Sequence, residues 1–254
     1  MDKKIIQGNF SRNAPRYEDH ASVQRQCARI LVDSLKGKEY PNILEIGCGT
    51  GIYTRLLRST NKEARITAVD ISPDMINIAK ERMQDDKIVY LTEDGENIDL
   101  DADFELVTSN ASFQWFEDLH KAMAMFTGHL KKGGLLCFSM YGPDTFHEFK
   151  KVLNKHYGSR KWLSSSRFIP FGTVKAVMDK YFSRVELSEK HFEVEFISLW
   201  DMLKDIKHSG TRGEGLGRST FLGRYGLREM EKTYMEKYGR IVATHHVFFC
   251  KAQM

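Results

Sequence analysis

Short apolar runs alternate with segments of helical pattern through the first two-thirds of the chain. The apolar runs cover residues 42–47, 65–70, 87–91, 104–110 and 135–140. Runs this short with no polar face are typical of strands buried on both sides, as in a parallel sheet. Between two of them, Ser72 and Pro73 have the pattern of a helix start, with serine as the N-cap. The alternation predicts an α/β fold with a doubly wound, mostly parallel sheet.

The pattern is different after the fifth apolar run. Residues 183–196 predict two further strands, and residues 245–252 predict a last one. Residues 143–181 and 197–240 are helical and irregular in pattern, and we interpret them as insertions that cap the sheet. No internal repeat or low-complexity linker divides the chain, so the sequence predicts a single domain over residues 1–254.

The composition is that of an ordinary globular protein and excludes several classes. The 254 residues are 41% hydrophobic and 28% charged, which is neither a disordered nor a collagen-like composition. No apolar run reaches the roughly 18–20 residues that span a bilayer, and residues 1–10 lack the apolar core of a secretory signal. The four cysteines are far apart and form no C-x-x-C pair for metal or redox chemistry. We therefore expect a cytoplasmic protein without a membrane segment or a metal site.

A glycine loop directly follows the first predicted strand. Residues 45–51 read E-I-G-C-G-T-G, and glycines allow a sharp turn that brings a ligand against main-chain N–H groups. The dinucleotide pattern G-x-G-x-x-G would need another glycine where Ile52 stands, which disfavours an NAD-dependent dehydrogenase. Asp70 ends the second strand, where a carboxylate can accept both hydroxyls of a ribose. The loop and the acid together predict a nucleoside-binding site.

Polar residues also follow the third and fourth predicted strands. Residues 93–96 read Glu-Asp-Gly-Glu, and residues 109–111 read Ser-Asn-Ala. The carboxyl ends of parallel strands meet at one edge of a sheet, which is where open α/β sheets bind ligands. We therefore expect these segments to share one site with the glycine loop.

This set of motifs resembles the class I S-adenosylmethionine (SAM)-dependent methyltransferases, whose first motif E/D-x-G-x-G-x-G stands at residues 45–51. The resemblance implies a Rossmann-like, seven-stranded, mostly parallel sheet with an antiparallel last strand, and SAM as the methyl donor. It implies that Asp70 holds the ribose, that Asp94 meets the adenine amino group and that Asn110 lines the methionine end. The positions that it places around SAM are Gln24, Glu45, Gly47, Cys48, Gly49, Gly51, Asp70, Ile71, Met75, Asp94, Gly95, Glu96, Asn110 and Ala111.

The N-terminal segment narrows the resemblance further. Tyr17, Ala21, Gln24 and Ala28 have the spacing of one helix face, which predicts a lid helix over about residues 10–36. The pattern F-S-x-x-A-x-x-Y-x-x-x-A-x-V-Q resembles the malonyl-acyl carrier protein O-methyltransferases of biotin synthesis. So do two later segments, at residues 110–116 and 196–210. The resemblance implies methylation of the free carboxylate of a malonyl thioester, on the route to a pimeloyl thioester.

The lack of an evident catalytic dyad is consistent with that chemistry. A carboxylate is already ionised at pH 7, so it can attack a sulfonium methyl group without a general base, given positioning and desolvation. We expect no acid or base residue. The substrate-positioning candidates are Tyr17, Trp115 and Tyr141 as walls, with Lys207, His208 and Arg212 as contacts to the carboxylate or to phosphopantetheine.

The net charge of +4 is unevenly distributed. Residues 149–178 contain seven basic residues and no acidic one, so the rest of the chain carries −3. A positive surface would steer an acidic acyl carrier protein towards the enzyme. The candidate docking residues are Lys150, Lys151, Lys155, Arg160, Lys161 and Arg167. The stretch lacks the interleaved aromatic residues of a single-strand groove, so we expect no nucleic-acid partner.

Three other functions remain open from the sequence. A carboxyl methyltransferase for a small free acid such as trans-aconitate would also need no base. A quinone or other C-methyltransferase should carry a conspicuous base near the pocket, and none is evident. A SAM-binding regulator without turnover would keep the same glycine loop.

Overall fold

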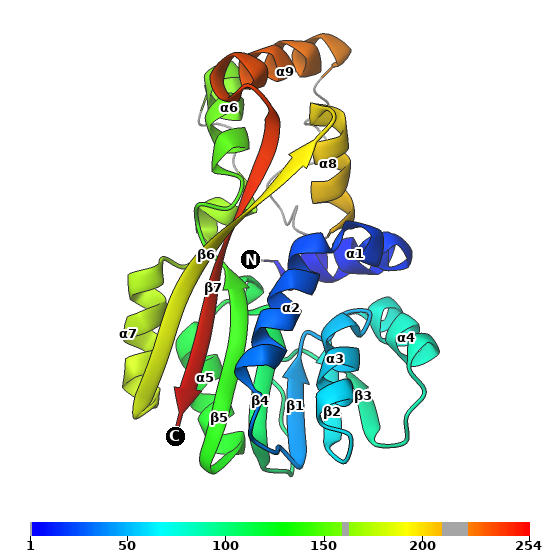
Figure 1. The fold of residues 1–254 in the computed structure, drawn as a ribbon, viewed down its shortest axis with the longest axis vertical. Helices are drawn as coiled ribbons and strands as arrows, with labels where there is room; N and C mark the ends of the chain where they lie inside the picture. The colour runs from blue at the N-terminus through cyan, green and yellow to red at the C-terminus, as the bar shows by residue number, and fades with distance from the viewer. Residues whose placement is uncertain (1, 159–162, 210–222) are drawn as a thin grey trace.

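The protein is described here by a computed structural model, which covers residues 2–158, 163–209 and 223–254. Within these residues, seven strands form one sheet in the order β3-β2-β1-β4-β5-β7-β6 (Figure 1). The strands are β1 (Asn42–Ile46), β2 (Arg65–Asp70), β3 (Ile88–Thr92), β4 (Phe104–Asn110), β5 (Leu130–Tyr141), β6 (Arg184–Phe196) and β7 (Ile241–Gln253). The first five strands pair in parallel, and β7 is antiparallel to both β5 and β6. The predicted doubly wound, mostly parallel sheet is confirmed.

Helices cover both faces of the sheet. One face packs against α2 (Ser22–Ser34), α3 (Ile52–Thr60) and α4 (Pro73–Arg82). The other packs against α5 (Leu119–His129) and α7 (Phe171–Tyr181). Neighbouring residues of one strand, such as Ile43 and Leu44 in β1, belong to opposite layers because side chains alternate across a sheet. The core strands are therefore apolar on both sides, as their sequences predicted.

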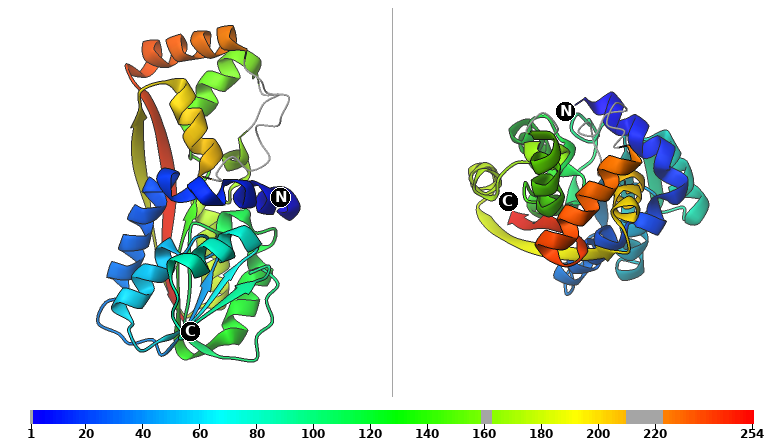
Figure 2. Two further views of the ribbon diagram at one scale, coloured as in Figure 1. Left: turned by 90° about the vertical axis from the view of Figure 1, so that its right-hand side faces the viewer. Right: turned by 90° about the horizontal axis from the view of Figure 1, so that it is seen from above.

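A helical cap stands beyond the carboxyl edge of the sheet (Figures 1 and 2). It consists of α6 (His147–Tyr157), α8 (Leu199–His208) and α9 (Arg224–Tyr238), which enclose a separate apolar cluster with the far ends of β6 and β7. The two long strands therefore run from the sheet into the cap and connect them. Within the described residues, no helix has the length and apolar character needed to cross a bilayer.

Two predictions for the second half of the chain were wrong. The two strands predicted over residues 183–196 are the single strand β6 (Arg184–Phe196), because the edge strand pairs with β7 along its whole length while its outer side chains stay polar. Helix α7 is not part of the cap, although it lies within the predicted insertion at residues 143–181. Its apolar residues Val174, Val177 and Met178 pack beside α5 on the sheet.

The N-terminal segment is not the one helix predicted over residues 10–36. It forms α1 (Lys3–Asn13), a 3₁₀ helix η1 (Ala14–His20) and then α2. Helix α1 begins early because the Asp2 side chain accepts a hydrogen bond from the Lys4 N–H at 2.8 Å. Pro15 has no N–H to continue α1, and the chain turns again at Ala21. We call α1 and η1 the lid, because they lie between the sheet edge and the cap (Figure 2).

Candidate active site

A pocket lies at the carboxyl ends of β1 to β4, beneath the lid. We call it the strand-end pocket. Its lining residues are Lys3, Ile6, Phe10, Tyr17, Ile46, Gly47, Gly49, Asp70, Ile71, Met75, Asp94, Gly95, Asn110, Ala111, Ser112, Trp115 and Phe116. The pocket therefore combines the four strand ends expected from the sequence with residues of the lid.

The glycine loop after β1 is shaped by backbone bonds to the next strand. The N–H groups of Gly47 and Cys48 both donate to the Val69 carbonyl, at 2.7 and 2.9 Å. Gly47 has φ of 70°, and a Cβ at this position would overlap the Ser112 side chain. Only glycine allows both the left-handed conformation and this close approach. The loop then enters α3 through Gly51, so the amino end of a helix faces the pocket region.

Asp70 lies at the end of β2 and is held in place by two backbone donors. Gly49 N–H donates to one carboxylate oxygen at 2.8 Å, and Ser72 N–H donates to the other at 2.9 Å. Burial raises the pKa of Asp70 to about 6, although these two hydrogen bonds favour its ionised form. The carboxylate is thus preorganised and charged at pH 7, which suits it to accept hydroxyl groups.

Asp94 follows β3 and forms an ion pair with the lid. Lys3 Nζ lies 2.5 Å from Asp94 Oδ2 and 2.6 Å from Glu96 Oε2. Burial would raise the pKa of Asp94, but the hydrogen bonds from Lys3 and Asn97 outweigh it and lower that pKa. The first turn of the lid therefore occupies one of the carboxylates that the sequence predicted for a nucleoside.

Further polar contacts hold the lid over the pocket. Gln7 Nε2 donates to the Ile71 carbonyl at 2.8 Å, just after β2. In η1, the Glu18 carboxylate accepts from the Thr50 hydroxyl at 2.7 Å and from Arg55 at 2.8 Å. The lid is thus tied to the glycine loop and to the loop after β2.

Aromatic side chains enclose one end of the pocket. The Phe10 ring packs edge-on against Tyr17 and Trp115, with centroids 6.3 and 6.1 Å apart. Trp115 Nε1 is a buried donor without a hydrogen-bond partner among the described residues, and so is the hydroxyl of Tyr141. Buried donors are rarely left unpaired, and Trp115 lines the pocket, so its Nε1 is available to a polar group of a ligand.

The structure sorts the residues predicted to surround SAM into two groups. Those that line the strand-end pocket are Gly47, Gly49, Asp70, Ile71, Met75, Asp94, Gly95, Asn110 and Ala111. Those that do not line it are Gln24, Glu45, Cys48, Gly51 and Glu96. These five residues lie outside the pocket lining, and several of them form hydrogen bonds within the fold.

Three of the residues that do not line the pocket have distinct surroundings. Glu96 accepts the N–H groups of Glu117 and Asp118 at 3.0 and 2.6 Å. Gln24 offers its main-chain carbonyl to Asn110 Nδ2 at 3.0 Å. Burial raises the pKa of Glu45 to about 8, with the charge of Asp70 adding to the shift. Gln24 thus bonds to Asn110, which lines the pocket, whereas Glu96 holds the chain that follows Phe116.

The substrate-positioning candidates are also divided. Tyr17 and Trp115 line the strand-end pocket, whereas Tyr141 is buried next to it and bonds through its N–H to Gln114 Oε1 at 3.2 Å. Lys207 and His208 line a separate pocket between the lid and α8. Arg212 lies outside the described residues.

The basic stretch is divided between several elements. Lys150, Lys151 and Lys155 lie on α6 in the cap, while Arg167 lies in the 3₁₀ helix η4 (Ser164–Arg167). Arg160 and Lys161 fall outside the described residues. The described basic residues therefore do not lie on one helix, and Lys150, Lys151 and Lys155 belong to the cap.

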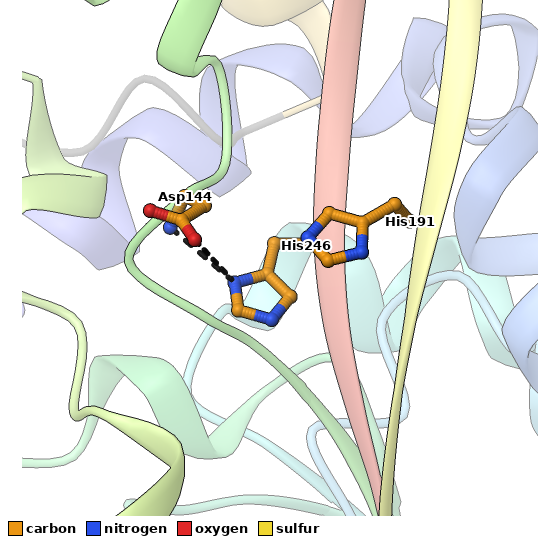
Figure 3. Close-up of side chains that lie close together, drawn as sticks. All are labelled: Asp144, His191 and His246. Atoms are coloured by element: carbon orange, nitrogen blue, oxygen red, sulfur yellow. Dashed lines mark hydrogen bonds and ion pairs between the residues drawn. The ribbon is translucent and has the colours of Figure 1, made fainter.

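A group of metal-ligand residue types lies elsewhere, where β6 and β7 leave the sheet. His191 and His246 are cross-strand partners with stacked rings 4.4 Å apart, and Asp144 approaches His246 from the loop after β5 (Figure 3). His246 Nδ1 is 3.8 Å from Asp144 Oδ2, and its Nε2 is 2.9 Å from Glu189 Oε2. Both ring nitrogens of His246 thus face carboxylates, and the cluster joins the two strands to this loop.

An open α/β sheet with an antiparallel β7, a glycine loop after β1 and an acid at the end of β2 define a class I methyltransferase. Residues 44–138 match a family model described as a methyltransferase domain. The chain is 32% identical to the malonyl-acyl carrier protein O-methyltransferase of Acetivibrio thermocellus, over 98% of this chain and 93% of the relative. A relative of the same name from Ilyobacter polytropus is 31% identical, over 98% and 94%. The chain therefore belongs to the malonyl-acyl carrier protein O-methyltransferase family.

Solved structures support the same fold. The YcgJ protein of Bacillus subtilis superposes with a TM-score of 0.63 at 11% identity, over 90% of this chain and 97% of its own. The N-methyltransferase NodS of Bradyrhizobium japonicum, solved with S-adenosyl-L-homocysteine, gives 0.56 at 16% identity, over 98% and 97%. As a methyltransferase of this class, the protein uses SAM as its methyl donor.

Several residues of the site were not predicted from the sequence. Lys3, Ile6, Phe10, Ser112 and Phe116 line the pocket without having been predicted to do so. Phe10 and Phe116 lie within the motifs that carried the family resemblance, so those motifs were a usable signal. Lys3 gave no signal, because its partner Asp94 lies 91 residues away in the chain.

Proposed function

We propose that the protein methylates the free carboxylate of a malonyl thioester carried on an acyl carrier protein. The observation that carries this proposal is the similarity to relatives of that name, which extends over 98% of the chain and thus includes the cap. The product would be the methyl ester of the malonyl thioester. Loss of the terminal charge would allow the chain to be elongated towards pimeloyl thioester for biotin synthesis.

We infer a role in donor binding for each pocket residue from its position. Asp70 would accept the ribose hydroxyls, and Asp94 would accept the adenine amino group after exchanging its contact with Lys3. Ile71 and Met75 would flank the adenine ring. The glycine loop and Asn110 would border the methionine part. The geometry that supports this arrangement is the preorganised Asp70 carboxylate beside the close backbone turn at the glycine loop.

The chemistry that we propose needs positioning rather than proton transfer. A carboxylate oxygen of the substrate forms a bond to the methyl carbon, while the bond from that carbon to sulfur breaks. The bonding electrons remain on sulfur, which becomes the neutral thioether of S-adenosyl-L-homocysteine, and the substrate loses its negative charge. The enzyme must hold the nucleophile in line and exclude water from it.

The aromatic end of the pocket is suited to those two tasks. The unpaired donors Trp115 Nε1 and Tyr141 Oη would hold one carboxylate oxygen and leave the other free to attack. Phe10 and Tyr17 belong to the lid and would exclude water when the pocket is closed. A donor placed on the non-attacking oxygen selects for a carboxylate without protonating its nucleophilic partner.

We propose that the acidic carrier protein docks on the cap through α6. Lys151 and Lys155 are exposed there, Lys150 is half-buried, and none of the three forms an ion pair within the described part of the chain. Free cations on one helix would speed the encounter with an acidic partner, and added salt would weaken the effect. Charge reversal by Lys151→Glu with Lys155→Glu should lower kcat/KM for the carrier-bound substrate, and more at low salt than at high salt.

The test of the proposed function is the transfer of labelled methyl groups from SAM to three acceptors. These are malonyl-acyl carrier protein, malonyl-CoA and trans-aconitate. The proposal predicts a base-labile methyl ester with the malonyl thioesters and the highest kcat/KM with the carrier-bound form. Preferred methylation of trans-aconitate would favour a small-acid methyltransferase, and SAM binding without any transfer would favour a regulator.

A further inference from the structure

Another pocket lies where the lid meets the cap. It is lined by Asn9, Arg12, Asn13, Pro15 and Arg16 from the lid, and by Lys207 and His208 from the end of α8. Figures 1 and 2 show α1 passing beneath the lower end of α8. We call this the lid–cap pocket.

Among the described residues, no carboxylate forms an ion pair with the cations that line the lid–cap pocket. Arg12, Arg16 and Lys207 form no ion pair with an acidic residue among those described. Arg12 instead donates to the Gly8 carbonyl and to Asn9 Oδ1, both at 2.8 Å. The nearby carboxylate of Asp205 already bonds to His20 Nδ1, at 2.9 Å. The pocket thus gathers cations from α1, η1 and α8, and the described residues supply no counter-ion to them.

The titration of His208 reflects this positive environment. Its Nδ1 lies 3.1 Å from Asn13 Oδ1, and its ring stacks on His20 with centroids 4.9 Å apart. Burial lowers the pKa of His208, and the charges of His20, Lys207, Arg16 and Lys204 lower it further. A bound anion would relieve this repulsion.

Helix ends alone do not account for the cluster. Basic side chains in the last turn of a helix stabilise its dipole, which suits Arg12 in α1 and Lys207 in α8. Here, however, two such ends meet and Arg16 adds a third cation from η1. Like charges brought together from different elements repel each other, and an anion bound between them would relieve that repulsion.

The two pockets share one wall. Asn9 faces the lid–cap pocket while its neighbour Phe10 lines the strand-end pocket, and Arg16 and Tyr17 are divided in the same way. Consecutive Cα atoms are about 3.8 Å apart, so the pockets are separated by little more than the lid backbone. A ligand in the lid–cap pocket would therefore be bound on the opposite side of the lid from the strand-end pocket.

We propose that the lid–cap pocket binds a phosphate ester, namely the phosphate of the pantetheine arm that presents the malonyl group. Arginine binds phosphate oxygens through paired N–H donors, and lysine adds a point charge. Because its cations come from both the lid and α8, the bound phosphate fastens the lid to the cap and closes the strand-end pocket. This inference rests on the proposed function, and it assigns Lys207 and His208 to the arm rather than to the malonyl carboxylate.

The kinetic test compares substrates with and without this phosphate. Malonyl-pantetheine lacks it, whereas malonyl-phosphopantetheine and malonyl-CoA both carry it. The wild-type KM should be about tenfold or more higher for malonyl-pantetheine than for either phosphate ester, because a charge-assisted hydrogen bond is lost. Malonyl-phosphopantetheine and malonyl-CoA should have similar KM values, because the pocket recognises the phosphate that both molecules carry.

Variants then assign the effect to the pocket. Arg16→Gln and Lys207→Met alter exposed side chains, so neither disturbs the core. Each should raise the KM for the phosphate esters about tenfold and leave the KM for malonyl-pantetheine unchanged. Lys204→Met is the matched control, since Lys204 is an exposed lysine of α8 that does not line the pocket. Its KM values should all stay near those of the wild type.

A binding measurement separates this inference from the proposed function. Phosphopantetheine titrated into the wild-type protein should give a calorimetric signal that the double variant Arg16→Gln/Lys207→Met loses, whether or not any malonyl thioester is methylated. Equal wild-type KM values with and without the phosphate would overturn the inference. So would variants that raise the KM for malonyl-pantetheine equally, or phosphopantetheine binding that survives the double substitution.

Discussion

The buried carboxyl of Asp70 should make donor binding depend on pH. Burial raises its pKa to about 6, and its two oxygens are already held by the N–H groups of Gly49 and Ser72. Accepting two ribose hydroxyls requires the ionised carboxylate, because a protonated oxygen becomes a donor. The affinity for the donor should therefore fall as the pH drops below the pKa of Asp70.

The size of the effect follows from the fraction of ionised Asp70. When only the ionised form binds, the apparent dissociation constant is the intrinsic one divided by that fraction. With a pKa of about 6, the constant should rise about 1.1-fold at pH 7, about 2-fold at pH 6 and about 11-fold at pH 5. Glu45 has a pKa of about 8, so it stays mostly protonated over this range.

The assay is calorimetric titration with S-adenosyl-L-homocysteine at pH 5, 6 and 7. The wild-type dissociation constant should rise about tenfold from pH 7 to pH 5, whereas Asp70→Asn should bind more weakly with little slope. A flat wild-type profile would refute the reasoning. A slope that persists in Asp70→Asn would refute it as well, because it would assign the titration to another group.

Three substitutions test other parts of the site. Gly47→Ala should weaken S-adenosyl-L-homocysteine binding more than tenfold and lower the melting temperature. The new Cβ would overlap the Ser112 side chain, and the left-handed conformation costs a residue with a Cβ about 1–2 kcal/mol. An unchanged affinity would show that the loop can shift to accommodate the Cβ. Tyr141→Phe should leave the melting temperature unchanged, since the hydroxyl has no partner within the described residues. It should raise the KM for malonyl-acyl carrier protein several-fold. A lower melting temperature with an unchanged KM would show instead that the hydroxyl has a structural role. Lys3→Met should lower the free energy of unfolding by about 1–3 kcal/mol, because buried Glu96 loses its cation. It should also speed limited proteolysis of the lid. An unchanged rate of proteolysis would contradict this role of Lys3.

The sheet was predictable because its signals are local. Residues 65–70 and 104–110 are strands with the predicted bounds, since a buried strand shows as a short apolar run. The glycine loop and Asp70 were predictable for a similar reason, as both lie at fixed places relative to strand ends. These features need no knowledge of the rest of the fold.

The lid and the cap depend on contacts between distant segments, and the sequence could not place them. The break after α1 was missed, although Pro15 is a visible signal, because the spacing around Tyr17 also suited one helix. Helix α7 was assigned to the cap because nothing in its own sequence identifies α5 as its packing partner. The lid–cap pocket joins Arg16 to Lys207, and only the tertiary structure brings those residues together.

The central claim is that the reacting group of the substrate is the malonyl carboxylate. The most direct measurement is NMR of the product formed from malonyl-acyl carrier protein and SAM with a carbon-13 methyl group. The claim predicts a labelled ester methyl whose protons correlate with the terminal carboxyl carbon of the malonyl group. A label on the central carbon of the malonyl group, or no transferred label with active SAM-binding protein, would contradict it.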